Sequence, residues 1–165
     1  MTLTAASTLT SNNNAITFTS TINGGFALVI NAGTSTVSFG GNVGQITGNF
    51  EDGVGSLTVT AGGGITLAAA ATEMWTTGSQ TYNSPVTLAA ATKFASYRGT
   101  VTFASTLAAG ANDLTIWADE IDFTGGNNSI SGTGRLVLDN FNVVLSIIFN
   151  GTDRKSTRLN SSHYA

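Results

Sequence analysis

The stretch Gly62-Gly63-Gly64-Ile65-Thr66-Leu67 contains the unit from which this chain is built, a glycine turn followed by an apolar-polar-apolar triplet. Val86-Thr87-Leu88 repeats the triplet 21 residues later. Successive side chains of an extended strand point to opposite faces, so we expect Ile65 and Leu67 to face a core while Thr66 faces water. A triplet is too short to be stable alone, but stacked copies at a fixed spacing bury a continuous core.

Two kinds of triplet recur along the chain. One kind ends in Phe, and its copies start 21, 64 and 20 residues apart: Ile16-Thr17-Phe18, Val37-Ser38-Phe39, Val101-Thr102-Phe103 and Ile121-Asp122-Phe123. Because 64 is close to three times 21, these triplets are interpreted as equivalent strands of different coils. The other kind is aliphatic throughout or has Thr at its centre: Leu28-Val29-Ile30, Leu57-Thr58-Val59, Ile65-Thr66-Leu67, Val86-Thr87-Leu88, Leu114-Thr115-Ile116 and Leu136-Val137-Leu138.

This spacing predicts an all-β fold, a parallel β-helix of about seven coils with 20–22 residues each. Gly and Asn between the triplets, as in Gly40-Gly41-Asn42, predict tight corners because both residues tolerate positive φ. A β-sandwich is the competing fold, since it also has short strands with frequent turns. The constant spacing favours the solenoid. Its regularity weakens at residues 40–56 and 68–85, and Ala68 to Thr72 is interpreted as a loop or a short helical excursion.

The composition excludes several classes of function. Only 9% of the residues are charged, against roughly a quarter in average soluble domains, and there is no Cys. Disulfides, thiolate metal sites and thiol catalysis are therefore excluded. No apolar run approaches the ~20 residues of a membrane helix, so no membrane insertion by this segment is expected. Met1 is not followed by a secretory signal, and we expect any export signal to lie outside this piece.

The C-terminal residues differ from the rest of the chain. The stretch from Asp153 to His163 holds three of the six basic residues and the only His, and it resembles a DNA sequencing adapter translated in one frame. We therefore interpret residues 1–152 as a β-helix repeat fragment and residues 153–165 as a non-native, disordered tail. Three basic and eight acidic residues precede residue 153. No nucleic-acid partner is expected, because phosphate binding needs clustered Lys and Arg.

The repeats resemble the β-strand repeat regions of filamentous-haemagglutinin-like and autotransporter-like surface proteins of bacteria. The resemblance covers residues 10–138 and rests on these segments: Asn12 to Gly33, Val37 to Gly44, Leu57 to Leu67, Thr77 to Asn83, and Val86 to Leu88. It implies right-handed β-helices that are exported to the cell surface, outer membrane-associated or extracellular, and involved in adhesion or biofilm. The stretch from Asp139 to Asn150 departs from the pattern because it lacks Gly and Thr punctuation.

The leading functional hypothesis is a structural and adhesive segment of a large exported protein, acting as a rigid spacer and a multivalent contact surface. Its expected partners are glycans or neighbouring cell-surface proteins. Strand edges at both ends are expected to continue edge-to-edge into flanking repeats. No enzymatic activity, catalytic residue, cofactor or metal ligand is predicted.

A carbohydrate-active β-helix, related to polysaccharide lyases or glycosidases, is the first alternative. Asp119, Glu120 and Asp122 form the densest acidic cluster, and paired carboxylates can act as acid and base on a glycosidic bond. Solvated residues beside a strand explain them more simply, with Asp122 pointing outward. Trp75 is the aromatic residue expected to be exposed for stacking on sugar, because it falls in an irregular stretch.

An ice-binding, Thr-rich solenoid is the second alternative. A flat array of outward Thr side chains can order water, and ice binding would be expected to need a Thr-x-Thr pair on every coil. Only some coils carry such a pair, at Thr17/Thr19, Thr34/Thr36 and Thr58/Thr60. Thr is also an ordinary residue of soluble β-strands, which explains the composition without any ice-binding role.

Overall fold

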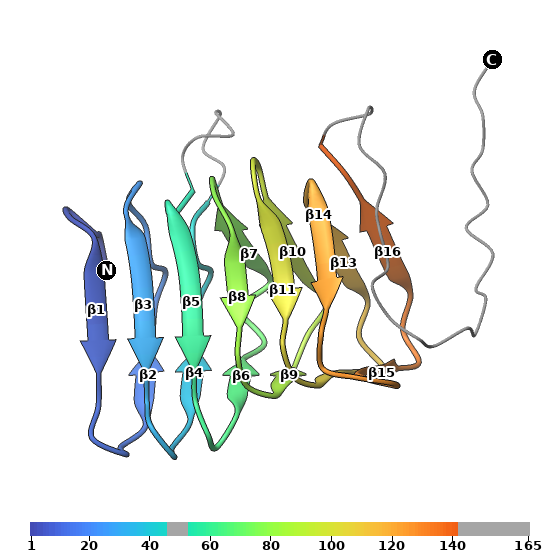
Figure 1. Cartoon of the computed structure of the whole chain (residues 1–165), viewed down its shortest axis with the longest axis horizontal. Helices are drawn as coiled ribbons and strands as arrows, with labels where there is room; N and C mark the ends of the chain where they lie inside the picture. The colour runs from blue at the N-terminus through green and yellow to red at the C-terminus, as the bar shows by residue number, and fades with distance from the viewer. Residues whose placement is uncertain (46–52, 142–165) are drawn as a thin grey trace.

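The computed structural model describes residues 1–45 and 53–141 and contains sixteen strands and no helix within those residues. All strand pairs are parallel and form three sheets, so the chain is a β-solenoid of six coils in its described part (Figure 1). In Figure 1 the first sheet runs down the near side and the chain returns up the far side as it advances from left to right, which is a right-handed path. The fold class predicted from the repeat spacing is confirmed.

Each coil contributes at most one strand to each of three faces. The first face contains β1 (Ser7–Thr10), β3 (Ala27–Asn31), β5 (Ser56–Thr60), β8 (Gln80–Tyr82), β11 (Thr100–Phe103) and β14 (Glu120–Phe123). The second face contains β2 (Ile16–Phe18), β4 (Val37–Phe39), β6 (Ile65–Leu67), β9 (Val86–Leu88), β12 (Leu107–Gly110) and β15 (Ile130–Gly132). The third face contains β7 (Glu73–Thr76), β10 (Thr92–Ser96), β13 (Leu114–Trp117) and β16 (Leu136–Asp139). Isolated bridges such as Val43 to Met74 extend the third face toward the N-terminus.

The register between coils confirms the predicted repeat length. Ile65 pairs with Val86, 21 residues later, and Leu114 pairs with Leu136, 22 residues later. Val37 pairs with Ile65 across 28 residues, because this coil includes the stretch around residues 46–52. Six coils are close to the predicted seven, and the rest of the predicted fragment, residues 142–152, lies outside the described residues.

The Phe triplets do not occupy equivalent strands, and this part of the prediction is wrong. Phe18 and Phe39 lie on the second face and stack at 5.3 Å between ring centroids. Phe103 lies on the first face, where it stacks on Tyr82 at 5.1 Å and on Phe123 at 5.9 Å. Any face accepts a triplet whose outer residues are apolar, so the 64-residue spacing crosses from one face to another. All the Phe residues of these triplets nevertheless pack in or against the core, as predicted.

The stretch from residue 68 to 85 is more regular than predicted. Ala71 N donates to Ala68 O at 2.8 Å in a single turn, and the chain then enters β7 and β8. A short helical excursion was therefore the wrong interpretation. Trp75 belongs to β7 and not to a loop.

The core contains one buried polar side chain that reaches from the first face to the third. Gln80 is aligned with Leu57 and Val101 in the neighbouring coils, where the side chains are aliphatic. Its Nε2 donates to Met74 O at 2.8 Å and to Ala95 O at 2.7 Å. These bonds join the first face to the third inside the core, and the triplet pattern does not indicate them.

Candidate functional site

The outer surface of the third face carries the densest group of aromatic side chains among the described residues. In the register of this sheet, Ala95 pairs with Trp75 on one side and with Trp117 on the other. Met74 and Phe94 face the core, so Trp75 and Ala95, one position further along, face outward. Two indole rings therefore flank a rung that carries only a methyl group.

The space over Ala95 is occupied by Phe141. Its ring stacks on Trp117 with a centroid distance of 4.1 Å and an angle of 7° between the planes. It meets Trp75 edge-on at 5.6 Å and Tyr97 edge-on at 5.5 Å. We call the group formed by Trp75, Ala95 and Trp117 the aromatic slot.

A charged pair lies along one edge of the aromatic slot. Lys93 Nζ lies 5.4 Å from the ring centroid of Trp75 and 4.6 Å from that of Trp117, within the range of cation–π attraction. The same ammonium group lies 3.7 Å from Glu73 Oε1. Both charged side chains are mostly shielded from solvent, with 29% and 23% exposed for Lys93 and Glu73. The pair is thus held against the aromatic rings.

The indole N–H of Trp117 is a donor that the aromatic slot leaves unused. Trp117 Nε1 is buried and has no hydrogen-bond partner in the described part of the chain. A phenyl ring such as that of Phe141 carries no polar atom that could accept this hydrogen. On the next rung Trp117 pairs with Asp139, an exposed carboxylate. Polar groups therefore surround the aromatic slot.

Trp75 does not have the exposure that its assignment to an irregular stretch predicted. Its side chain is 0% exposed, because strand β7 holds it beneath its neighbours on the third face. Gly53 approaches the indole so closely that an added Cβ would lie 2.2 Å from Trp75 Cδ1. In this conformation Trp75 has no free ring face for a ligand. Trp117 and Phe141, which sequence reasoning did not single out as site residues, are half-buried.

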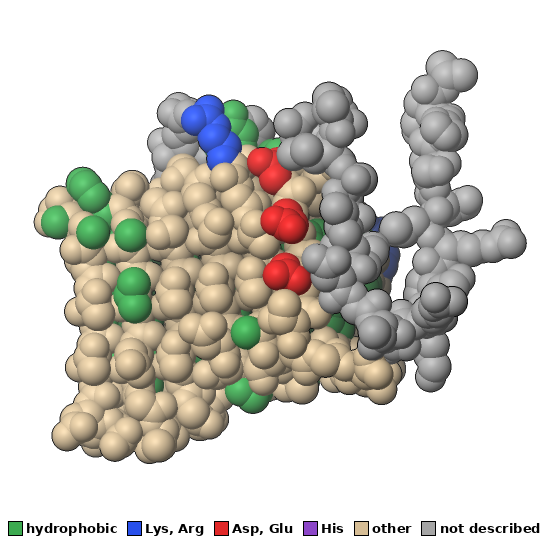
Figure 2. Space-filling model, in the orientation of Figure 1, with side chains coloured by type: hydrophobic (Ala, Val, Ile, Leu, Met, Phe, Trp, Pro, Cys, Tyr) green, Lys and Arg blue, Asp and Glu red, His purple; other side chains and the backbone are tan. Residues whose placement is uncertain are grey.

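The acidic cluster lies on another part of the solenoid. Asp122 pairs with Thr102 and faces outward from β14, as predicted, while Ile121 is buried. Glu120 is exposed, and its Oε2 accepts a hydrogen bond from Thr100 Oγ1 at 3.1 Å. Asp119 is half-buried, and its Oδ1 has no partner among residues 1–45 and 53–141. Figure 2 shows acidic side chains in a row near β14 on the first face, whereas Trp75 belongs to the third face.

The Thr-x-Thr pairs do not form one array. Thr17 lies on the second face, and Thr34 and Thr36 lie at the corner between β3 and β4. Thr58 and Thr60 lie on the first face. Thr58 is aligned with Val29 and Thr81, so the row of hydroxyls on that face is interrupted.

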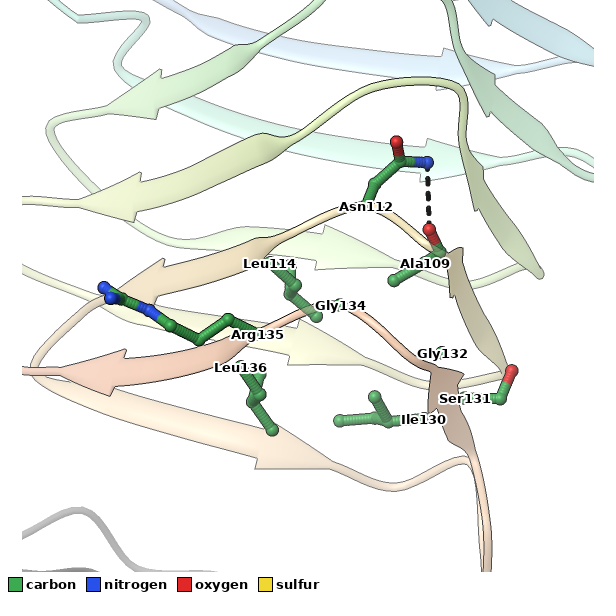
Figure 3. Close-up of a pocket in the computed structure, with 9 residues that line it drawn as sticks. All are labelled: Ala109, Asn112, Leu114, Ile130, Ser131, Gly132, Gly134, Arg135 and Leu136. Atoms are coloured by element: carbon green, nitrogen blue, oxygen red, sulfur yellow. Dashed lines mark hydrogen bonds between the residues drawn. The ribbon is translucent and has the colours of Figure 1, made fainter.

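The end of the sixth coil is hollow. A cavity of about 210 Å³ is lined by residues of the last two coils, and Figure 3 shows the side chains of Ile130 and Leu136 extending into this space. Leu136 is 48% exposed, although Leu114, its partner on the previous coil, is buried. Among the described strands, β14, β15 and β16 each form the outer edge of a sheet. Apolar side chains and unpaired backbone groups are thus presented together.

These features define a three-faced parallel β-solenoid with an aromatic slot on one outer face and a hollow, open-edged end. No family model, curated protein or solved structure matches the chain. The described residues contain no helix that could cross a membrane and no cluster of three or more potential metal ligands.

Proposed function

We propose that this chain is a structural and adhesive repeat segment of a larger exported bacterial surface protein. It acts as a rigid spacer and presents a repetitive, charge-poor surface for multivalent contact with glycans or neighbouring cell-surface proteins. The observation that carries the proposal is the in-register stacking of six coils, which repeats the same outer positions along the axis.

Rigidity follows from the way the coils are joined. Each interior strand bonds to one strand on either side, and the inward residues form one continuous core cluster from Leu3 to Ile121. Each coil adds roughly 4.8 Å to the length, so further repeats would lengthen the rod without altering its cross-section. Such a rod holds a distant binding surface away from a cell at little entropic cost.

The outer surface is suited to weak repeated contacts. On the second face the outward row is formed by small, mostly hydroxyl-bearing side chains: Thr17, Ser38, Thr66, Thr87, Ala108 and Ser131. The first face is likewise poor in charge, as Figure 2 shows. A single hydroxyl contact in water contributes little, but many identical contacts give avidity.

The open ends support a position inside a longer rod. At the C-terminal end, β14, β15 and β16 offer backbone groups beside the exposed Leu136. A flanking coil would pair these edges and fill the hollow. The proposal therefore includes further repeats and an export signal in the parent gene, which sequencing of the complete gene would test.

Multivalent adhesion can be tested with the full chain displayed on beads at graded density. We expect retention on glycan-coated surfaces to rise by about 100-fold or more from sparse to dense display, because binding becomes intramolecular after the first contact. The double substitution Thr66→Val and Thr87→Val removes two adjacent hydroxyls of the second face and keeps the β-branched shape. It should lower retention and leave the melting temperature unchanged. Equal retention at all densities would contradict the adhesive part of the proposal.

A further inference from the structure

We propose that the aromatic slot is a binding site for one neutral pyranose ring of a glycan, and that Phe141 occupies it when no glycan is bound. This inference deepens the proposed glycan contact, but it concerns the third face and is independent of the hydroxyl row on the second face. It assigns a specific site where the proposed function requires only a repetitive surface.

The dimensions of the aromatic slot suit a single flat ring. Trp75 and Trp117 stand two rungs apart, which separates their backbones by roughly 9.6 Å. A ring inserted between two aromatic faces needs about 3.5–4 Å on either side. Phe141 demonstrates the fit, because its ring lies 4.1 Å from Trp117 and parallel to it within 7°. The apolar face of a pyranose can occupy the same position.

The polar groups around the aromatic slot favour a sugar over a phenyl ring. Trp117 Nε1 is a buried donor without a partner in the described part of the chain, and a sugar hydroxyl can accept its hydrogen. Lys93 and Glu73 offer a donor and an acceptor at the rim. A bound pyranose thus replaces the apolar contacts of Phe141 and adds hydrogen bonds that Phe141 cannot make.

The charges favour a neutral sugar. Lys93 is the basic side chain that contacts both indole rings, and its ammonium group is already paired with Glu73 at 3.7 Å. Asp139 adds a negative charge on the rung beside Trp117. An acidic glycan would therefore meet no uncompensated positive charge among these groups, and a hydroxyl-rich neutral glycan meets both donors and acceptors.

Phe141 acts as a tethered competitor. It follows β16 of the sixth coil by two residues, yet its ring contacts Trp75 of the third coil. The chain therefore turns back along the outer surface of the third face. A short tether gives an effective concentration in the millimolar range, so a free glycan binds only to the fraction of molecules in which Phe141 has left. Removal of the phenyl ring should raise the apparent affinity.

The proposal is tested on the full chain by calorimetry and tryptophan fluorescence, with cellohexaose as the neutral probe. We expect Phe141→Ala to bind cellohexaose at least about 10-fold more tightly than the unsubstituted chain. The double variant Phe141→Ala/Trp117→Ala should lose this binding. Phe26→Ala is the matched control, since Phe26 is 44% exposed and its removal should leave the affinity unchanged.

Three results would overturn the proposal. These are no gain in affinity for a folded Phe141→Ala, undiminished binding by the double variant, and tighter binding of hexagalacturonate than of cellohexaose. If Phe141→Ala unfolds, Phe141→Leu provides the same test, because leucine keeps an apolar contact but lacks the flat ring. The Thr66→Val/Thr87→Val variant should bind cellohexaose normally, so failure of the aromatic slot and failure of hydroxyl-row adhesion are distinguishable.

Discussion

Tyr82 donates its phenolic hydrogen to Gln80 Oε1 across 2.9 Å inside the core of the solenoid. The Gln80 amide in turn donates to the carbonyls of Met74 and Ala95 on the third face. Both side chains are fully buried, and this network satisfies every polar group of the glutamine. Two residues on one short strand thereby tie two faces of the solenoid together.

Replacement of Gln80 with Leu should destabilise the chain. Although Leu matches the aliphatic residues above and below it, the change leaves two carbonyls and the Tyr82 hydroxyl without their partner. We expect a loss of about 2–4 kcal/mol in the free energy of unfolding, measured by urea titration. Thr81→Val, on the outward side of the same strand, is the matched control and should change it by less than about 0.5 kcal/mol. Equal stability of Gln80→Leu and the unsubstituted chain would contradict this account of the core.

Alkaline pH should destabilise the fold through Tyr82. Burial raises the pKa of the Tyr82 hydroxyl well above its ordinary value of about 10. A raised folded-state pKa means that the stabilisation is complete below about pH 10 and is lost as the pH rises from there toward the folded pKa. The contribution of Tyr82 should fall by up to about 1.4 kcal/mol per pH unit in that window.

Urea midpoints measured between pH 9 and 11 check this pH dependence. Tyr82→Phe should give a flatter curve above pH 10, because the unfolded chain then lacks the ionising group. Parallel curves for the two proteins would show that Tyr82 does not contribute to alkaline unfolding.

Gly24 and Gly25 provide a matched pair for the corner before β3. Gly24 has φ of 113°, and an added Cβ would lie 2.3 Å from Leu3 O. Gly25 has nothing within 4 Å of the same atom. We expect Gly24→Ala to cost about 1–3 kcal/mol, with displacement of the N-terminal residues, while Gly25→Ala changes stability by less than about 1 kcal/mol. Thermal unfolding of the two variants measures the difference, and equal effects would be inconsistent with the close approach of Leu3.

The open end of the sixth coil should cause self-association of the full chain. Leu136 is exposed beside three strand edges, and a second molecule can cover both. Sedimentation velocity at tens of micromolar should reveal oligomers, and Leu136→Lys should shift the population toward monomer because it places a charge at this end. A chain that stays monodisperse at all concentrations would contradict the prediction.

Local patterns were sufficient to predict most of the fold. Ile65, Thr66 and Leu67 alternate because an extended strand has two faces, and β6 shows the predicted alternation of buried and exposed side chains. The outward orientation of Asp122 followed from the same rule. Trp75 was misplaced because its strand lacks this alternation: Met74, Trp75 and Thr76 are all buried.

The sequence by itself determined that the chain forms short inward-facing strands repeated about every 21 residues, since strand alternation and corner residues are local properties. Only the tertiary structure decided which triplets share a face, why Gln80 is tolerated in the core, and that Phe141 reaches Trp75 and Trp117. These relationships depend on how many residues each corner uses and on which rungs become neighbours. The side chains that meet are more than 20 residues apart in the chain, and their contact is set by the register of the whole stack.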